Sequence, residues 1–403
     1  MRLLFVVQRY GIEVAGGAEA FCRLFAERLR RRDINVEVVT SCATSYVDWA
    51  DVYEPGTHVI NGVPVHRLRV ERPRKDDLFG PLNARVMAGE RPIPLYLQEE
   101  WMEMQGPVLD GFGPWLDDHV ESFDAVVFFT YLYHPTWAGL HAVAGRVPTL
   151  LHPTAHDEPP LYLPIFDFLM RLPDAVGYLT EEEQSLFEAR FGSGRPSTVT
   201  GIGVDLDVFG DPDRFRRQFG LDEDPFLLYT GRIDPHKGAV ELFDFFSAYK
   251  QRNPGNLKLV YVGEPVRPLD AHADVVVTGF VEECVKADAF EAALALAQPS
   301  YFESFSMVLT EAWAHAKPAL VQGRCAVLAG QVLRSGGGLP YCGFAEFEAG
   351  LDLLLSSEVL AEQMGHAGRR YVEERYEWES VLQNYERFIR RLATDSLRTP
   401  LRA

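Results

Sequence analysis

Short runs of apolar residues alternate with amphipathic segments along nearly the whole chain. The runs are bounded by turn-forming residues and are rich in β-branched and aromatic side chains, which is typical of strands buried on both faces of a parallel sheet. In the segments between these runs, apolar residues recur with the spacing of an amphipathic helix. One such segment is expected to be helical over 18–31 and has on one face Phe21, Leu24, Phe25 and Leu29. The expected strands are residues 2–8, 35–41, 63–70, 125–131, 148–155, 175–180, 197–204, 226–231, 257–263, 273–281, 294–300 and 318–323. This alternation predicts the α/β class with doubly wound parallel sheets.

The alternation runs twice, with a break at 205–225 that is rich in Asp, Pro and Gly. We therefore expect two Rossmann-like domains, residues 1–204 and 205–375. Residues 376–403 contain a last amphipathic helix, which is expected to pack back on the N-terminal domain. Ligands of such sheets bind beyond the carboxyl ends of the strands, so a site in the cleft between the two domains is predicted.

The charge balance restricts the partners of the protein. The chain of 403 residues has 39 Lys and Arg against 58 Asp and Glu, a formal net charge of −19. This balance disfavours non-specific binding to nucleic acid or to an anionic membrane, because both need positive surface. Residues 125–145 lack charged side chains, but Pro135 and several polar residues interrupt them, and a strand followed by a helix is expected there rather than a membrane span.

The cysteines predict neither a disulfide framework nor a zinc site. Five cysteines are scattered over the chain, and no pair or Cys/His cluster has metal-ligand spacing. We expect a protein of a reducing compartment, located in the cytoplasm, with no metal site.

Two loops at predicted strand ends have the composition of anion-binding sites. Gly16 and Gly17 precede a helix, where backbone N–H groups can approach an anion closely; a simple flexible loop is the alternative. Arg232 and Lys237 lie five residues apart in a Gly/Pro turn that also opens a helix. Two cations at that position suit a diphosphate, although a solvated turn with unrelated charges remains the alternative.

Two further segments contain candidate carboxylates and a histidine. Glu303 and Glu311 are eight positions apart, which is about 12 Å along the axis if both are helical. Carboxylates accept hydrogen bonds from vicinal sugar hydroxyls, but such a pair is common on ordinary helices. His156, beside Asp157 at the end of a predicted strand, could polarise a hydroxyl, and a structural histidine is the alternative.

Aromatic side chains gather in two segments that precede and follow the fourth predicted strand. They could form a surface on which a sugar stacks, although buried core is the stronger interpretation. The residues are Trp101, Tyr131, Tyr133 and Trp137.

Taken together, these segments resemble a known family. GRIDPHKG and ESFSMVLTEAWAHAKP, with GGAE near the N-terminus and GIGVDLDVF at 201–209, are similar to the retaining GT-B glycosyltransferases of the glycogen-synthase-like superfamily, family GT4. The resemblance covers essentially the whole chain. It implies two Rossmann-like domains, a nucleoside-diphosphate-sugar donor held mainly by the C-terminal one, and no required metal or other cofactor.

The resemblance also implies roles for individual residues. Those expected to bind the diphosphate are Arg232, Lys237 and, from the N-terminal domain, Gly16 and Gly17. Those expected around the transferred sugar are Glu303, His156 and the backbone of Ser304, Phe305, Ser306 and Met307. Glu311 is expected to bind the ribose, and the backbone of Phe280 and Val281 to bind the base. Ser306 and Ala316 stand where the family usually has glycine.

The expected function is transfer of a hexosyl group to an acceptor hydroxyl with retention, with Glu303, Arg232, Lys237 and His156 as catalytic residues. The acceptor, whether glycan, lipid-linked or small molecule, is left open. Two alternatives remain: a related epimerase or phosphorylase, and a non-catalytic nucleotide-sugar-binding module. The intact pair of donor motifs argues against both.

Overall fold

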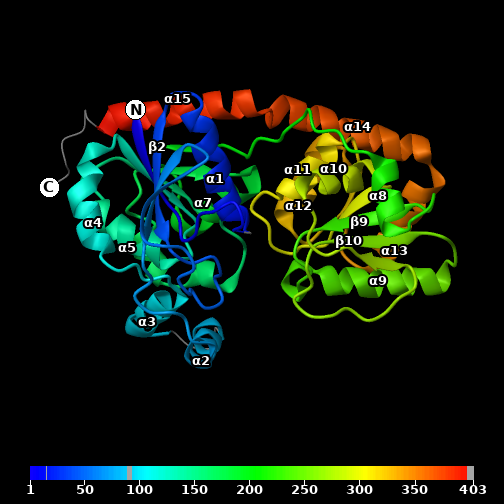
Figure 1. Ribbon diagram of the computed structural model, residues 1–403, viewed down its shortest axis with the longest axis horizontal. Coiled ribbons are helices and arrows are strands. Elements are labelled where there is room, and N and C mark those ends of the chain that lie inside the picture. Colours follow the sequence, from blue (N-terminus) through cyan, green and yellow to red (C-terminus); the bar gives the residue numbers. More distant parts are fainter. Residues whose placement is uncertain (15, 89–92, 397–403) are drawn as a thin grey trace. The chain divides into compact units, whose positions relative to one another are not determined.

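The computed structural model describes residues 1–14, 16–88 and 93–396, and the chain forms two compact units. The first unit comprises residues 1–200 and 382–403, and the second comprises residues 201–381. Both are α/β, as the sequence predicts, and Figure 1 shows helices around each sheet. Residues 397–403 of the expected C-terminal segment lie outside the described part.

The first unit is built on an eight-stranded sheet in the order β3-β4-β2-β1-β5-β6-β7-β8. All neighbouring strands are parallel except β3 and β4, which form an antiparallel hairpin through Asn61 and Gly62, both with positive φ. The strands are β1 (Arg2–Val6), β2 (Asn35–Ser41), β3 (Gly56–Ile60), β4 (Val63–Leu68), β5 (Ala125–Phe129), β6 (Thr149–His152), β7 (Ala175–Tyr178) and β8 (Ser197–Val199). Strand β3 was not predicted, because it is an edge strand and most of its residues are exposed.

The helices that follow these strands cover the sheet of the first unit, and residues 125–145, which lack Asp, Glu, Lys and Arg, form β5 and α5. The helices are α1 (Gly17–Arg30), α2 (Asp76–Met87), α3 (Leu95–Gln105), α4 (Phe112–His119), α5 (His134–Val143), α6 (Ile165–Leu169) and α7 (Glu181–Phe191), with short 3₁₀ turns at Val120–Ser122 and Pro159–Tyr162. Helices α2 and α3 lie together beyond the rest of this unit (Figure 1). No helix in the described ranges is long and apolar enough to cross a membrane.

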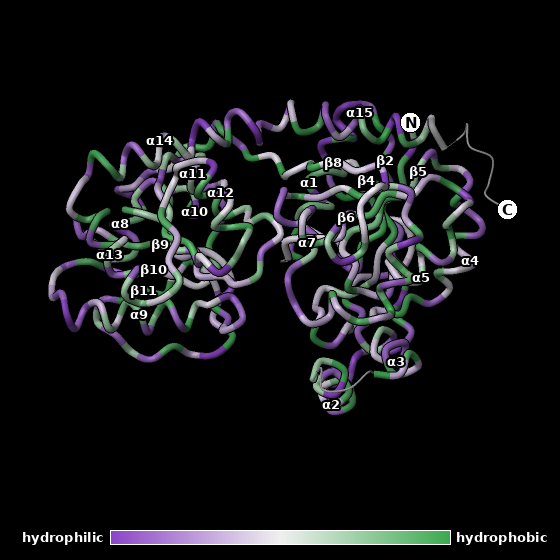
Figure 2. Tube along the Cα trace, turned by 180° about the vertical axis from the view of Figure 1, so that it is seen from behind, coloured by the Kyte–Doolittle hydropathy of each residue, from purple (hydrophilic) through white to green (hydrophobic). Residues whose placement is uncertain are grey.

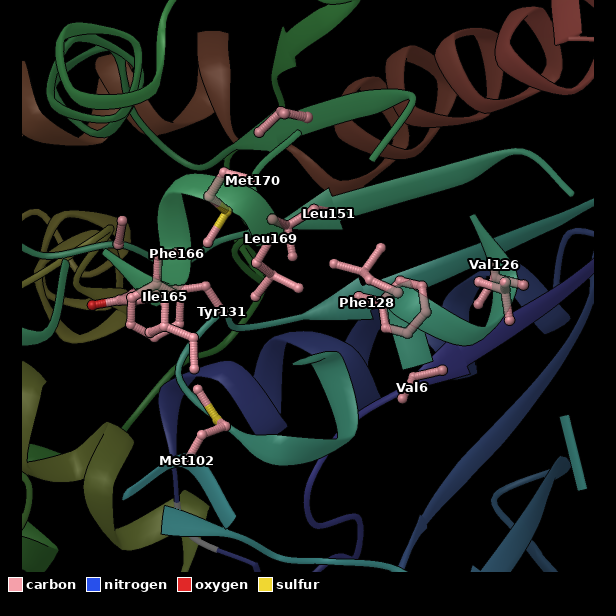
Figure 3. Packing of buried hydrophobic residues seen from close by; sticks show 14 of the residues in the cluster. Val6, Met102, Val126, Phe128, Tyr131, Leu151, Ile165, Phe166, Leu169 and Met170 are labelled. Atoms are coloured by element: carbon pink, nitrogen blue, oxygen red, sulfur yellow. The ribbon is translucent and has the colours of Figure 1, made fainter. Parts of the chain in front are cut away.

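The core of the first unit fills the space between the sheet and its helices. Figure 2 shows hydrophobic residues gathered along its central strands, and Figure 3 shows Phe128 of β5 near Leu151 of β6 in the buried cluster. Tyr131 and Phe166 meet edge to face, with ring centroids 4.8 Å apart. Dense packing of this kind fixes the carboxyl ends of β5 and β6, from which candidate site residues extend.

The second unit has a six-stranded, all-parallel sheet in the order β11-β10-β9-β12-β13-β14. Its strands are β9 (Phe226–Thr230), β10 (Lys258–Val262), β11 (Val275–Val277), β12 (Ala295–Gln298), β13 (Ala319–Gln322) and β14 (Gly338–Tyr341). Strand β14 was missed because three glycines and Pro340 are poor strand formers; it is an edge strand, where such residues are tolerated.

The helices of the second unit follow its strands, and the last helix of the chain continues into the first unit. They are α8 (Pro212–Phe219), α9 (Ala239–Arg252), α10 (Glu283–Ala292), α11 (Met307–Ala314), α12 (Ala326–Ser335), α13 (Phe344–Ser356) and α14 (Glu358–Arg375), with a 3₁₀ turn at Pro235–Lys237 and then α15 (Trp378–Ser396). From Leu382 onward α15 belongs to the first unit, where Tyr385 is buried against Phe25 and His152.

Candidate functional site

The loops after β9 and β10 are fixed against each other at the carboxyl edge of the second sheet. Gly231 N donates to Val262 O (2.9 Å), and Ile233 N donates to Glu264 O (3.0 Å). Gly263 has φ 149°, and a Cβ there would lie 2.1 Å from Gly231 O, so only glycine allows this approach. The backbone that carries Arg232 is therefore held on two sides.

Arg232 and Lys237 both project from this fixed segment. Asp234 accepts a hydrogen bond from His236 N (2.9 Å), which starts the 3₁₀ turn, and its other oxygen lies 3.4 Å from Arg232 Nε. Gly238 ends the turn in the left-handed region, where a Cβ would lie 2.2 Å from Pro299 O. The turn thus holds Lys237 next to the loop that follows β12.

That loop carries Glu303, and the structure joins the two candidate motifs there. Lys237 Nζ donates to Glu303 Oε1 at 2.9 Å. The carboxylate side chain is 14% exposed, whereas the lysine side chain is 42% exposed and open to a ligand. Glu303 lies outside α11, so the 12 Å axial spacing between Glu303 and Glu311 does not apply.

Ser304, Phe305, Ser306 and Met307 lead from Glu303 into α11. Phe305 is buried against the ring of Tyr376 (5.0 Å between centroids), and its carbonyl accepts a hydrogen bond from Gln331 Nε2 (2.5 Å). These contacts anchor the loop on its buried side. Leu309 N donates to Ser306 O (3.1 Å), while the N–H groups of Met307 and Val308 stand at the helix N-terminus, where intrahelical acceptors are missing and an anion can bind.

The two departures from the family pattern lie where glycine would be favoured. Ser306 has φ 71° and Ala316 has φ 52°, both in the left-handed region. Gln298 Nε2 donates to the Ser306 hydroxyl (2.9 Å), which supports the serine in this conformation. The local backbone conformation therefore survives the loss of both glycines.

Glu311 lies one turn into α11 and contacts a lysine that the motifs did not single out. Lys286 Nζ lies 3.1 Å from Glu311 Oε1, while Glu311 Oε2 is buried and has no hydrogen-bond partner. Burial raises the pKa of the Glu311 carboxyl, and the Lys286 ammonium opposes that rise. An unpartnered buried oxygen is costly and is well suited to accept a hydrogen bond from a ligand hydroxyl.

Phe280 and Val281 follow β11, and one of their backbone groups is already occupied. Phe280 N donates to Glu264 Oε1 at 3.1 Å, and the phenyl side chain is 82% exposed. The Glu264 carboxylate thus links the loops after β10 and β11.

Gly16 and Gly17 belong to the first unit and have different surroundings. Gly16 is the N-cap of α1, and a Cβ there would lie 2.2 Å from Glu19 Oε2. Gly17 has no atom within 4 Å of a Cβ position. Arg9 Nε and Nη2 donate to Glu19 Oε1 at 2.9 and 2.5 Å, and both side chains are buried. A Cβ on Gly16 would therefore displace the Glu19 carboxylate from this ion pair, whereas a Cβ on Gly17 would meet open space.

His156 follows β6 in the same unit, and a buried glutamate fixes its loop. Its Nδ1 lies 3.5 Å from Glu158 Oε1. Ala155 N and Leu179 N both donate to Glu183, at 2.7 and 2.6 Å. The loop is therefore tied to the end of β7.

Other side chains of these segments belong to the core. His152 is fully buried, donates from Nδ1 to Gly177 O (2.8 Å), and has its pKa lowered by burial to about 4. Trp101 and Tyr131 are also buried, so neither forms a sugar-stacking surface (Figure 3 labels Tyr131). Tyr133 and Trp137 are partly exposed.

The sequence motifs missed four residues that hold the candidate residues in place. They are Arg9, Glu183, Glu264 and Lys286. Each contacts its partner through tertiary packing, so spacing along the chain gave no signal for it.

Each half of the chain matches a known protein family. Residues 16–203 match the glycosyl transferase 4-like domain, and residues 211–371 match glycosyl transferases group 1. A D-inositol 3-phosphate glycosyltransferase of Xylanimonas cellulosilytica is 28% identical over 331 residues, covering 76% of this chain and 75% of the relative. D-inositol 3-phosphate glycosyltransferase 2 of Catenulispora acidiphila is 30% identical over 333 residues, covering 76% and 74%.

Solved structures share the fold. The sucrose-phosphate synthase of Thermosynechococcus elongatus superposes with a TM-score of 0.72 at 19% identity, covering 98% of this chain and 99% of that one. HepE from Anabaena, solved in complex with UDP and glucose, superposes with a TM-score of 0.70 at 16% identity, covering 96% and 98%.

Proposed function

Since the chain belongs to the group 1 glycosyl transferases and is a glycosyltransferase of the GT-B fold, we propose that it moves a hexosyl group from a nucleoside-diphosphate sugar to an acceptor hydroxyl. The observation that carries this proposal is the Lys237–Glu303 contact of 2.9 Å beside the first turn of α11. A cation, a carboxylate and a helix N-terminus then lie together at one sheet edge. Such a set suits a sugar joined to a diphosphate.

The departing diphosphate is stabilised by protein cations. Cleavage of the anomeric bond places negative charge on the diphosphate, and Arg232, Lys237 and the N–H groups that open α11 stabilise it. Glu303 accepts hydrogen bonds from hydroxyls of the transferred sugar. The reaction is proposed to need no metal ion and no cofactor, because the nucleoside-diphosphate sugar is a substrate.

The nucleoside is proposed to bind beside Glu311, one turn into α11. The unpartnered Glu311 Oε2 accepts from ribose hydroxyls, and the backbone of Phe280 and Val281 contacts the base. In the first unit, Gly17 leaves room for a diphosphate and His156 serves the transferred sugar. What supports the last two roles is the open space beside Gly17 and the partial exposure of the His156 side chain.

Transfer proceeds with retention. The acceptor oxygen attacks the anomeric carbon on the face from which the diphosphate leaves, and the departing phosphate oxygen takes the acceptor's proton. No carboxylate nucleophile is required, unlike in retaining glycosidases. Glu303 can therefore remain paired with Lys237 throughout.

The protein is proposed to act in the cytoplasm, without a nucleic-acid partner. Its five cysteines are unpaired, and a net charge of −19 disfavours polyanions. The acceptor remains open to a glycan, a lipid-linked sugar or a small molecule.

The decisive experiment screens nucleoside-diphosphate sugars by thermal shift and then follows release of the nucleoside diphosphate. A bound donor raises the melting temperature as its concentration exceeds the Kd. We expect one donor class to stabilise the protein and to be hydrolysed slowly without acceptor. Stabilisation without any release, with or without an acceptor panel, would identify a binding module instead. Release of epimerised sugar, or a requirement for phosphate, would identify the epimerase or the phosphorylase.

A further inference from the structure

Lys286, in the first turns of α10, contacts two carboxylates that differ in their surroundings. Its Nζ lies 2.7 Å from Glu283 Oε2 and 3.1 Å from Glu311 Oε1. The side chain of Glu283 is 86% exposed, whereas those of Lys286 and Glu311 are 21% and 31% exposed. Water weakens the first contact far more than the second, so the Lys286–Glu311 pair is the stronger of the two.

The pair uses the two oxygens of Glu311 unequally. Oε1 is held by Lys286, while Oε2 is shielded from solvent and has no partner. Because a carboxylate is planar and rigid, fixing one oxygen also fixes the direction of the other. The lysine therefore determines where the unpartnered acceptor points.

No other charged side chain in the described part of α10 or α11 is placed to replace Lys286. His315, at the end of α11, acts on Glu311 only through its electrostatic field, and its Nδ1 is bonded to Glu291 Oε1 at 2.8 Å. Glu283 carries the same charge as Glu311 and repels it. Among the residues that the structure describes, Lys286 is the only cation in direct contact with this carboxylate.

We propose that Lys286 is a positioning residue that holds Oε1 of Glu311 and so presents Oε2 to the ribose hydroxyls of the donor. This step rests on the proposed function, in which Glu311 binds the ribose. It also implies a selectivity: a nucleotide without ribose hydroxyls leaves the buried Oε2 unpaired and binds weakly. Lys286 thus helps the site to select ribonucleotides.

The test compares affinities for a ribonucleoside diphosphate and its 2′,3′-dideoxy analogue by calorimetry. UDP, GDP and ADP are tried first, and the tightest binder and its analogue are then used. The variants are Lys286→Met, Lys286→Arg and Glu311→Gln. Lys258→Met is the matched control, because that lysine is 22% exposed and also pairs with a carboxylate, lying 2.7 Å from Asp274.

The wild-type protein should bind the ribonucleotide roughly tenfold or more tightly than the dideoxy analogue, as expected for hydrogen bonds to a buried carboxylate. Lys286→Met should weaken ribonucleotide binding by about fivefold or more and reduce this ratio, with little effect on the analogue. Lys286→Arg should keep most of the wild-type preference for the ribonucleotide, and Lys258→Met should leave that preference unchanged. A merely structural lysine would weaken both nucleotides equally.

The outcomes separate this proposal from the one on which it rests. Suppose that Lys286→Met keeps the wild-type preference for the ribonucleotide over its dideoxy analogue, while Glu311→Gln loses that preference. This result would refute the role of Lys286 and leave the ribose assignment of Glu311 intact. An unchanged ratio in Glu311→Gln would refute the ribose assignment itself. If Lys286→Met does not fold, Lys286→Gln is measured in the same titrations and judged by the same ratios.

Discussion

The Lys237 ammonium lies 2.9 Å from Glu303 Oε1, although the residues are 66 positions apart in the sequence. The contact joins the turn before α9 to the loop before α11, and each side chain orients the other. An ammonium has three N–H donors, so Lys237 can contact Glu303 and a phosphate oxygen at once. The groups proposed to bind the sugar and the leaving diphosphate thus form one ion pair.

Lys237→Ala should reduce turnover by orders of magnitude while the melting temperature changes little. The lysine side chain is 42% exposed, and an exposed ion pair contributes about 1 kcal/mol or less to stability. The measurement is nucleoside-diphosphate release at saturating donor, beside a thermal melt. Arg252→Ala is the control, because Arg252 forms an exposed pair with Glu348 (2.8 Å) and should retain full activity. Turnover of Lys237→Ala within threefold of wild type would contradict the assigned role.

Activity should survive an excess of EDTA. The described residues include no group of three His, Cys, Asp or Glu side chains arranged to hold a metal ion. Arg232 and Lys237 are proposed to stabilise the diphosphate instead. The measurement is transfer before and after chelation; loss in EDTA that magnesium or manganese restores would show that the cations are insufficient.

Gly16 and Gly17, at the start of α1, should respond differently to alanine. In Gly16→Ala the new Cβ would lie 2.2 Å from Glu19 Oε2, which disturbs the buried Arg9–Glu19 pair and should lower stability by about 2 kcal/mol. In Gly17→Ala the Cβ meets nothing within 4 Å, so the melting temperature should hold.

Donor kinetics complete the comparison of these glycines. If Gly17 lies close to the diphosphate, Gly17→Ala should raise the KM for the donor in a protein of wild-type stability. Equal melting temperatures for the two variants would show that the Arg9–Glu19 pair does not constrain Gly16.

Periodicity predicted most of the two sheets because their central strands are continuous apolar runs. It failed at one edge of each sheet, where β3 is largely exposed and β14 contains glycine and Pro340, whereas the other edge strands, β8 and β11, lie within predicted strands. There the neighbouring strand, and not local propensity, determines the conformation. The α/β class and the family are nevertheless confirmed.

The sequence predicted the candidate site residues that lie within its motifs, but not the contacts that these residues make. Arg232, Lys237, Glu303 and Glu311 stand in recognisable segments, but which side chains they contact depends on packing between distant elements. Nothing in the sequence pairs Lys286 with Glu311, 25 residues away. A serine does not itself signal the positive φ of Ser306, and the signal for it was the glycine that the family usually has at this position.

Glu183 should make stability fall as the pH rises through mildly acidic values. Burial raises its pKa to about 7 in the folded protein, against an ordinary value of 4.5. Its contribution to stability is therefore complete below pH 4.5 and is lost as the pH approaches 7, by up to about 3 kcal/mol. Denaturation of wild type and Glu183→Gln from pH 4.5 to 7.5 should show a difference that depends on pH. A constant difference would mean that Glu183 is ionised throughout, held by Ala155 N and Leu179 N.

The last prediction separates Glu303 from Glu311. Glu311 is proposed to contact the ribose, which the donor and the released nucleoside diphosphate share, so Glu311→Gln should raise KM and weaken nucleotide binding with a modest change in kcat. Glu303 is proposed to contact the transferred sugar, whose ring gains charge in the transition state, so Glu303→Gln should chiefly lower kcat. Calorimetry with the nucleoside diphosphate decides between them: Glu303→Gln should bind it about as tightly as wild type, and Glu311→Gln should not. If Glu311 only pairs with Lys286 on the helix surface, the two variants will bind the nucleotide equally, and this division of roles is wrong.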